Sequence, residues 1–560
     1  MENTKSHAQV ETSRFTRIKW RDFKENLTGC VFILPAFVII GVFGLFPIGF
    51  SIYVSLHKWR INPGNFLGLD NYTKAIGNLA YIIFFWVAAI LIYLAVRSFR
   101  NLLKTTKEKQ ENPYIWIVPS FITTLGIASF VRFIVLLLPE ILGIANKVRG
   151  MVRTQELFVE LLGEAWRAPA VQSALRLSLL ILFIGFILAY LVNRYLAKGL
   201  HSSTNYSTWI LILIYLGLGI LLAWFNWVEI ERVYTQALET GEPVDIWAQV
   251  VTISAGFLLL LASWQIWKSA AGRNSNVSVV VRIVAAAVLA VGAWALIGEL
   301  PRAIQAGDAD WWAGLRVTVF YSAGTVPFQL GISLVLATLL YQEIRGKSLF
   351  RLIYFLPYIT PAVATAAIFR VFFSGRTNAP INSLLKYIGS QPLGWLDEPR
   401  GIIQMLVGDN MELTGWLAGP SLALLVIIIF NIWSYVGYDT VIFLAGLGGI
   451  PSELYEAASI DGASRWDQFR HVTLPLLSPT TYFLTLLAVI GTFKAFNHVW
   501  VLRNAAALGT TDTASIVIFT EFNRNTRYGY AASLAFVLLG VILILTIINN
   551  RVAEERVFYG

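Results

Sequence analysis

The chain has 560 residues, of which 56% are hydrophobic and 14% are charged, and its formal net charge is +10. This composition excludes a soluble globular core and is typical of a membrane protein, so the positive charge indicates basic loops facing the cytoplasm rather than a nucleic-acid surface. The single cysteine, Cys30, lies inside an apolar run, which excludes a disulfide framework and a cysteine-based metal site.

The N-terminal segment, Met1 to Asn26, is polar and lacks the short apolar core and cleavage site of a signal peptide. After it, apolar stretches recur that are long enough to cross a membrane, which takes about 20 residues. About twelve stretches meet that criterion. They begin near Cys30, Ala80, Tyr114, Leu177, Trp209, Ala248, Val279, Leu315, Phe350, Pro420, Thr480 and Tyr528. The sequence therefore predicts an all-α, polytopic membrane protein with about twelve transmembrane helices.

Basic residues gather in alternate loops, as expected for loops on the cytoplasmic side. They are Arg14, Arg17, Lys19, Arg21, Lys24, Arg97, Arg100, Lys104, Lys107, Lys109, Arg194, Lys198, Lys268, Arg273, Arg345, Lys347, Arg351, Arg551 and Arg556. The intervening loops are more acidic, for example around Glu229, Glu242 and Asp308. This pattern predicts that both termini are cytoplasmic, although Lys58 and Arg60 fall on the outer side. The loop from 140 to 170 is balanced in charge and amphipathic, so we expect it to lie along the membrane surface.

Between two long apolar runs lies the segment from Ile450 to Pro479, which must form a loop at one membrane face. Its turn chemistry predicts a short helix, a tight turn and a second short helix. Ser452 is the expected N-cap of the first helix, and Gly462 is expected to end it in a left-handed conformation. Ser464 and Asp467 form an S-x-x-D pattern that predicts the start of the second helix.

The same segment carries a recognisable pattern. It contains Glu456-Ala457-Ala458, then three residues, Gly462, nine residues, and Val472-Thr473-Leu474-Pro475. This resembles the EAA loop of the membrane subunits of ABC importers, with Val472 in place of the usual isoleucine. The longer sequence E-A-A-S-I-D-G-A-S-R-W-D-Q-F, residues 456–469, is similar to the same loop in carbohydrate importers of this family, especially in the larger permease subunit of maltose-type importers. In that family the loop is a coupling helix that seats in a cleft of the ATPase subunit. The alternative is an amphipathic interfacial hairpin without a partner.

This resemblance implies which residues contact the ATPase. They are Glu456, Ala457, Ala458, Asp461, Gly462, Ala463, Trp466 and Phe469. It also implies that the transported substrate contacts the two spans flanking the loop, at Asn431, Ser434 and Tyr435 in the first. In the second the matching positions are Ala488, Gly491, Thr492 and Ala495, which are smaller and less amide-rich than in the family and put an identical sugar in doubt.

The residues themselves favour a polar path in the first of these spans. Asn431, Ser434, Tyr435 and Tyr438 follow helical spacing on one face. Aromatic rings combined with amide and hydroxyl groups suit sugars, whose faces are apolar and whose rims form hydrogen bonds. The alternative for each polar residue is an interhelical hydrogen bond. Asp439 and Lys494 are ionisable residues within predicted spans. Each has two open interpretations: a functional role inside the bundle, or a side chain that extends from near the end of its span to the membrane surface.

The resemblance to sugar permeases is discontinuous. It covers Ile33 to Tyr72 and resumes near Trp311, and nothing is recognised between about 78 and 302. That insert holds six of the apolar runs. Because six is an even number of spans, the insert begins and ends on the same face of the membrane, which is expected to be the outer one. We therefore expect a six-span permease core carrying a self-contained bundle of three hairpins, either a peripheral bundle or a docking site for another protein. The expected divisions are 1–29 (cytoplasmic segment), 30–77 (first span and outer loop), 78–302 (insert) and 303–560 (core, with the coupling loop at 450–479).

No motif for enzyme chemistry is complete. Arg345-Gly346-Lys347-Ser348 ends like a phosphate loop, but Tyr341 stands where the first glycine is needed. The five histidines are too scattered for a metal site, and the sequence has neither an H-E-x-x-H nor a G-x-S-x-G motif. We therefore expect a non-enzymatic chain without its own cofactor, ATP and Mg²⁺ being bound by a partner ATPase.

The resemblance then predicts a permease subunit of an ATP-driven ABC importer for a sugar or oligosaccharide. Its implied partners are two ATPase copies, a second permease and an extracytoplasmic substrate-binding protein, in the lipid of a bacterial or archaeal cell membrane. Twelve spans would also suit a standalone secondary transporter. That class predicts inverted repeats, and the two halves of this sequence show no similarity to each other. An intramembrane enzyme predicts clustered carboxylates or histidines near a membrane face, and no convincing cluster occurs.

Overall fold

The computed structural model describes residues 20–60, 63–148, 150, 154–196, 202–241, 245–270, 276–342, 345–408 and 411–556. Several residues used above lie outside this range or have side chains that are not described. They are Arg14, Arg17, Lys19, Arg21, Lys24, Cys30, Lys198, Glu242, Arg273 and Arg556.

The described residues form helices joined by turns, with only two isolated β-bridges and no strand among them. The N-terminal half contains α1 (Trp20–Ile39), α2 (Phe46–Ser55), α3 (Asp70–Ile76), α4 (Leu79–Glu108), α5 (Ile117–Lys147), α6 (Gln155–Arg167), α7 (Pro169–Tyr195), α8 (Ser202–Thr240), α9 (Ile246–Ala270), α10 (Asn276–Ile297) and α11 (Leu300–Gln305). The C-terminal half contains α12 (Ala309–Tyr341), α13 (Lys347–Ile359), α14 (Ala362–Phe372), α15 (Pro380–Tyr387), α16 (Ile402–Val407), α17 (Leu422–Gly448), α18 (Ser452–Ile460), α19 (Arg465–Gln468), α20 (Leu474–Leu476), α21 (Ser478–Phe493), α22 (Asn497–Leu502), α23 (Ala514–Phe519) and α24 (Tyr528–Arg556).

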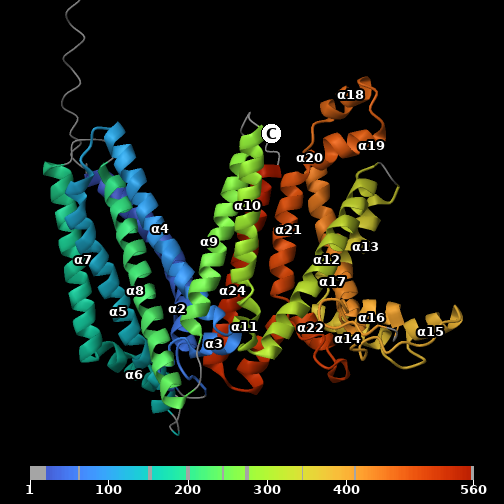
Figure 1. The fold of residues 1–560 in the computed structure, drawn as a ribbon, viewed down its shortest axis with the longest axis horizontal. Helices are drawn as coiled ribbons and strands as arrows, with labels where there is room; N and C mark the ends of the chain where they lie inside the picture. Colours follow the sequence, from blue (N-terminus) through green and yellow to red (C-terminus); the bar gives the residue numbers. More distant parts are fainter. Residues whose placement is uncertain are drawn as a thin grey trace, which may run out of the picture.

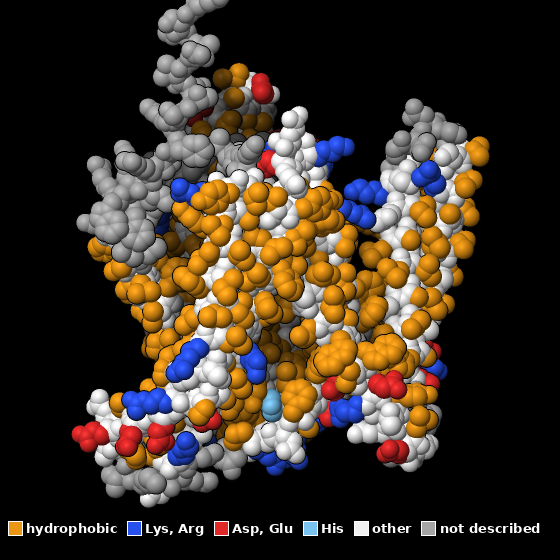
Figure 2. Space-filling model, turned by 90° about the vertical axis from the view of Figure 1, so that its left-hand side faces the viewer, with side chains coloured by type: hydrophobic (Ala, Val, Ile, Leu, Met, Phe, Trp, Pro, Cys, Tyr) orange, Lys and Arg blue, Asp and Glu red, His pale blue; other side chains and the backbone are white. Residues whose placement is uncertain are grey.

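The predicted all-α membrane architecture is confirmed. Among the described residues, 10 helices are long and apolar enough to cross a membrane, or up to 12 if two bent helix pairs each form one span. The bent pairs are α13 with α14, at 95°, and the stretch from Arg465 to Leu476 with α21, at 62°. A face of the molecule shown in Figure 2 carries a broad band of apolar side chains across its middle, with most charged side chains above and below it. Such a band is what a lipid environment requires.

The two ends of the helices differ in what they carry. The α18–α19 loop and the C-terminal end of α24 lie at one end of the molecule, at the top of Figure 1. The last turns of α4 and α9, which contain Lys107 and Lys268, also lie at this end. The opposite end is formed by α3, α6, the α14–α16 region and α22. The amphipathic helix expected in the 140–170 loop is therefore α6, and it lies at the end opposite α18 and α19.

The inserted helices pair differently from three consecutive hairpins. The main pairs are α5 with α7, α4 with α8, and α9 with α10, and α5 also packs against α8. Of these pairs, only α9 and α10 follow one another directly in the chain. Helix α6 lies between α5 and α7 in the sequence, and α5, α6 and α7 all lie between α4 and α8. This arrangement is visible at the left of Figure 1, where α8 runs alongside α4.

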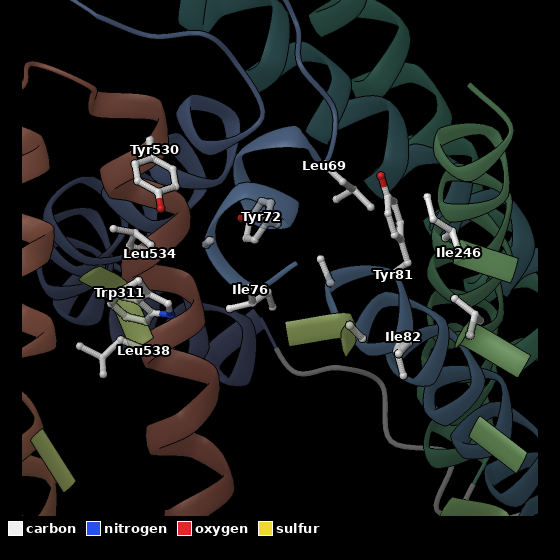
Figure 3. Packing of buried hydrophobic residues seen from close by; sticks show 14 of the residues in the cluster. Leu69, Tyr72, Ile76, Tyr81, Ile82, Ile246, Trp311, Tyr530, Leu534 and Leu538 are labelled. Atoms are coloured by element: carbon white, nitrogen blue, oxygen red, sulfur yellow. The ribbon is translucent and has the colours of Figure 1, made fainter. Parts of the chain in front are cut away.

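The insert is not isolated from the rest of the chain. One buried cluster contains Leu69, Tyr72 and Ile76 around α3, Tyr81 on α4, Ile246 on α9, Trp311 on α12, and Tyr530, Leu534 and Leu538 on α24. Figure 3 shows α3 lying between α24 and the helices of the insert. The apolar core therefore runs continuously from α24 through α3 into α4 and α9, and the expectation of a self-contained bundle is corrected to that extent.

Polar groups reinforce this junction. Arg232 on α8 lies 2.6 Å from Asp70 and 2.8 Å from Glu229, whose carboxylate also accepts a hydrogen bond from the Leu69 backbone at 3.5 Å. Gly68 has a φ of +57°, and a Cβ placed on it would overlap the Glu229 carboxylate. Glycine at this position therefore lets the loop before α3 approach α8 closely enough for these contacts.

Candidate functional site

The first helix of the loop at 450–479 begins one residue earlier than a serine cap at position 452 would place it. Pro451 occupies the N-cap position and Ser452 is the first helical residue, without a capping hydrogen bond, so the expected cap role of Ser452 is wrong. Proline fixes its own φ and cannot donate, which suits a position where the N–H has no helical partner. The carboxylate of Glu453 lies in the first turn, where it complements the helix dipole.

The end of α18 and the start of α19 follow the predicted turn chemistry. Gly462 has a φ of +82°, and its N–H donates to Ser459 O at 3.1 Å, while Ala463 N–H donates to Ala458 O at 2.9 Å. These two bonds form a left-handed helix end of the Schellman kind. Ser464 and Asp467 then form a reciprocal capping box, and the Ser464 hydrogen bonds lower the pKa of the Asp467 carboxyl.

Side-chain contacts hold the two short helices together as one elbow, defined as residues 452–476. Gln468 Nε2 donates to Ser459 Oγ at 2.8 Å, and the hydroxyls of Tyr455 and Thr473 are 3.0 Å apart. The rings of Trp466 and Phe469 stack with their centroids 5.5 Å apart. The elbow therefore has a defined internal geometry although it projects beyond the ends of the spans in Figure 1.

The elbow offers a large free surface. No residue of α18 is buried, and Ile460 and Trp466 are 86% and 65% exposed. Of the predicted contact residues, Glu456, Ala457, Asp461, Gly462 and Trp466 are exposed, and Ala458, Ala463 and Phe469 are half-buried. All eight predicted residues thus lie on one protruding structure, and exposed apolar side chains beside small ones mark a surface suited to a protein partner.

The second candidate feature is a cavity of about 370 Å³ between α12, α17, α21 and the start of α22. Six of the seven predicted substrate-path residues line it. They are Asn431, Tyr435, Tyr438, Gly491, Thr492 and Ala495. Ser434 is the exception, because it is buried and does not line the cavity. Ala488, Asp439 and Lys494 also line it.

A buried hydrogen-bonded chain of three polar side chains borders this cavity. Gln329 Nε2 on α12 donates to Asp439 Oδ2 on α17 at 2.6 Å, and Asn431 Nδ2 donates to Gln329 Oε1 at 3.1 Å. All three residues are 5% exposed or less. Asp439 is therefore held inside the bundle by a partner and does not snorkel to an interface. Sequence reasoning missed Gln329, and the available signal was a single amide within an apolar span.

Aromatic side chains form another wall of the cavity. Tyr358 at the end of α13 stacks on Tyr438 with the ring centroids 4.5 Å apart and meets Tyr435 edge-on at 5.6 Å. His498 stacks on Phe430 at 5.3 Å, and its Nε2 lies 2.7 Å from the Tyr321 hydroxyl. Tyr358 was not among the predicted path residues, because α13 approaches α17 only in the folded chain. His498 ends the candidate stretch of the second span, 491–498, but was not itself predicted to contact the substrate.

The remaining wall belongs to α21 and α22, which are separated by a break in helical structure. α21 ends at Phe493, Lys494 and Ala495 follow without helical structure, and α22 starts at Asn497. Thr492 Oγ1 donates to Ser322 Oγ at 2.8 Å, which joins α21 to α12. Lys494 and Asn497 are both exposed and border the cavity, so polar groups at the break face the open space rather than the packed core.

Two helices, α17 and α21, join the elbow to the cavity. Leu477, which follows the elbow directly, is fully buried in a cluster with Phe443 and Leu447 of α17. From there α21 runs without interruption to Phe493 and carries Gly491 and Thr492 on the cavity wall. The chain therefore runs directly from the elbow along α21 to the cavity wall. Among the described residues, no group of three His, Cys, Asp or Glu side chains is placed to hold a metal ion.

Comparison with known proteins places this arrangement in a family. Residues 329–556 match the family described as "Binding-protein-dependent transport system inner membrane component". The chain is 31% identical over 256 residues to the probable ABC transporter permease protein YesP of Bacillus subtilis, covering 45% of this chain and 75% of that protein. It is 30% identical over 253 residues to the lactose transport system permease protein LacF of Rhizobium radiobacter, covering 44% and 78%.

Another relative is the trehalose/maltose transport system permease protein MalF of Thermococcus litoralis, which is 27% identical over 247 residues and is matched over 44% of this chain and 76% of its own length. A solved structure of a bacterial alginate ABC transporter has a chain with a TM-score of 0.38 and 22% identity, covering 44% of this chain and 80% of that one.

The matches with curated relatives support the ABC permease interpretation over the standalone secondary transporter, and with the helices above they make this a multi-pass membrane protein. The chain belongs to the binding-protein-dependent transport system inner membrane components and is a membrane-spanning permease subunit of an ABC importer.

Proposed function

We propose that this permease carries a sugar or oligosaccharide, which a substrate-binding protein delivers at the membrane face opposite the elbow. The cavity supports this, because it combines stacked tyrosines with amide and hydroxyl groups in a volume of about 370 Å³. Small-molecule sites have volumes of roughly 300–1,000 Å³ and few polar groups. The names of the relatives agree, since they describe permeases for lactose, for trehalose and maltose, and for arabinooligosaccharides.

The elbow is proposed to be the contact with the ATPase. Two ATPase copies, which bind ATP and Mg²⁺, would grip the elbow of this chain and that of a second permease subunit. Closure of the ATPases on ATP would favour one arrangement of the spans, and their opening the other, so the cycle shifts the population between inward- and outward-facing states. The observation that carries this proposal is the unbroken path from the exposed elbow through buried Leu477 and α21 to the cavity wall.

The proposed orientation rests on the loop charges. We propose that the elbow and both termini are cytoplasmic, because Lys107 and Lys268 end helices on the elbow side. The insert at 78–302 is proposed to be an added six-span unit anchored on the outer loop that contains α3. The permease would lie in a bacterial or archaeal cell membrane, with its spans surrounded by lipid.

Reconstitution tests the proposal. The complete complex in proteoliposomes, with ATP inside, is expected to accumulate labelled lactose, maltose or trehalose only when the ATPase and the binding protein are both present. Collapsing the proton and sodium gradients with ionophores is expected to leave uptake unchanged. Uptake without the ATPase, or uptake abolished by the ionophores, would overturn the proposal. Uptake of a different class of solute would overturn the sugar assignment alone.

A further inference from the structure

The chain formed by Asp439, Gln329 and Asn431 has a direction. An ionised carboxylate contains only hydrogen-bond acceptors, whereas an amide contains one acceptor and one NH₂ donor. Asp439 therefore attracts the NH₂ end of Gln329, which turns the carbonyl end of Gln329 toward Asn431. That carbonyl in turn attracts the NH₂ end of Asn431. Each amide orientation is decided by its neighbour, as expected when hydrogen-bond networks settle the two ends of an amide.

The last member of this relay faces the cavity. One N–H of the Asn431 amide is engaged by Gln329, and the carbonyl oxygen of Asn431, Oδ1, is left over, because nothing among the described residues donates to that atom. The Asn431 side chain lines the cavity. An amide without the relay could rotate and offer either a donor or an acceptor, so it would discriminate little between ligand groups.

We propose that Gln329 and Asp439 are positioning residues that make Asn431 present a hydrogen-bond acceptor to the transported solute. The solute then supplies a donating hydroxyl at this point, and a solute group that can only accept is rejected. This inference rests on the proposed function, because it assigns a specificity rule to the proposed sugar cavity. Neither Gln329 nor Asp439 needs to touch the solute for the rule to hold.

The backbone around the relay is held in place, so the side chains act from fixed positions. Ser333 Oγ donates to Gln329 O at 2.6 Å on α12 and to Val436 O at 3.0 Å on α17. Thr440 Oγ1 donates to Val436 O at 2.7 Å and to Ser333 O at 3.4 Å. These bonds join α12 and α17 beside the relay, so a substitution of similar shape in the relay changes donors and acceptors rather than helix positions.

A double-variant cycle tests the relay, because Asn and Asp have the same shape. In Asp439→Asn the order of donors and acceptors can reverse, and position 431 then offers NH₂ to the cavity. In Asn431→Asp the Gln329 carbonyl is forced against a carboxylate. In the double variant, the carboxylate at position 431 accepts from Gln329, the amide at position 439 donates to Gln329, and the cavity again meets an acceptor oxygen.

The complex in proteoliposomes is assayed with whichever of lactose, maltose or trehalose the wild type takes up, and with monofluorinated derivatives of that sugar. Each single variant is expected to lower uptake at limiting sugar about tenfold, the effect of losing roughly one hydrogen bond. The double variant is expected to recover to within about threefold of wild type, as coupled neighbours do. Fluorine accepts but does not donate, so one fluorinated position is expected to block uptake in the wild type and the double variant but not in Asp439→Asn.

Losses that simply multiply in the double variant, or a fluorine profile identical in wild type and Asp439→Asn, would overturn the relay. A purely structural role of these residues would not move the fluorine profile. If the wild-type complex takes up none of the three sugars, the sugar proposal fails, and thermal unfolding of the same four proteins in detergent decides the relay. Recovery of Tm in the double variant supports it, and additive losses of Tm overturn it.

Discussion

The hydroxyls of Tyr455 on α18 and Thr473, which ends the π-helical turn after α19, lie 3.0 Å apart and join the two arms of the elbow. Thr473 is buried, whereas the surfaces of α18 on either side are open. This contact therefore ties the two arms of the elbow to each other. The chain continues within four residues to Leu477, which is buried in the core, so the elbow is fixed at its base and exposed along α18.

Tyr455→Phe is expected to loosen the elbow without unfolding the spans. It removes one hydrogen bond, worth about 1 kcal/mol, and leaves the ring in place. We expect the number of solute molecules imported per ATP hydrolysed to fall several-fold, because the ATPases would move α18 without moving α21 equally. Thr473→Ser retains a hydroxyl and serves as the control. An unchanged transport-to-ATP ratio in Tyr455→Phe would show that this contact does not stiffen the elbow.

Gly462→Ala is expected to distort the turn between α18 and α19. The φ of +82° at this position costs an L-residue with a side chain about 1–2 kcal/mol, although a Cβ there would meet nothing within 4 Å. The loss should therefore appear as weaker co-purification of the ATPase and not as a steric clash. Gly448→Ala is the matched control, since Gly448 also has open space but an ordinary helical φ. Equal effects of the two substitutions would contradict the role of the left-handed turn.

Glu456→Lys is expected to weaken ATPase association while leaving the Tm of the permease unchanged. The side chain is exposed and forms no ion pair among the described residues, so its reversal alters the docking surface alone. We expect binding to weaken at least about tenfold, or ~1.4 kcal/mol. Glu453→Lys, in the first turn of the same helix, changes the net charge equally outside the E-A-A pattern. If both variants bind the ATPase as wild type does, the elbow is not the docking site.

Some features of the fold could be predicted from the sequence and others could not, for physical reasons. The spans could be predicted because a backbone in lipid must satisfy its own hydrogen bonds, which requires long apolar helices. The elbow could be predicted because Gly462, Ser464 and Asp467 act on their immediate neighbours. The pairing of α4 with α8 could not, because these helices are apolar on most sides and any neighbour would bury them.

The cavity shows the same division. Helical spacing placed Asn431, Tyr435 and Tyr438 on one face, and these residues do border the open space. Ser434 lies at the edge of this face of α17, where neighbouring parts of the protein bury its side chain. Gln329 is visible in the sequence as a single amide in an apolar span, but its pairing with Asp439 could not be predicted. The two residues are 110 positions apart, and neither the spacing nor the composition of either span connects them.

Glu229→Gln is expected to destabilise the junction between the insert and the outer loop. Its carboxylate is almost fully buried, and it shares Arg232 with Asp70. Because Arg232 is partly exposed, we discount the cost of breaking a buried pair to about 1–2 kcal/mol. Thermal unfolding in detergent should show a lower Tm. Glu299→Gln breaks an exposed pair with Arg302 and should change the Tm very little, so equal shifts in the two variants would contradict the anchoring role.

Asn431→Ala should lower uptake, whereas Ser434→Ala should not, although the two residues lie one helical turn apart and both are buried. Asn431 borders the cavity and Ser434 does not, so only the first change removes a group that the solute can reach. We expect the KM for uptake to rise about tenfold in Asn431→Ala, since a hydrogen bond contributes about 1 kcal/mol and the Gln329 carbonyl is left without its donor. Both variants should be expressed at the wild-type level. Because Ser434→Ala tests the packing of α17 alone, a similar rise in KM in both variants would mean that disturbed helix packing, and not a solute contact, explains the loss.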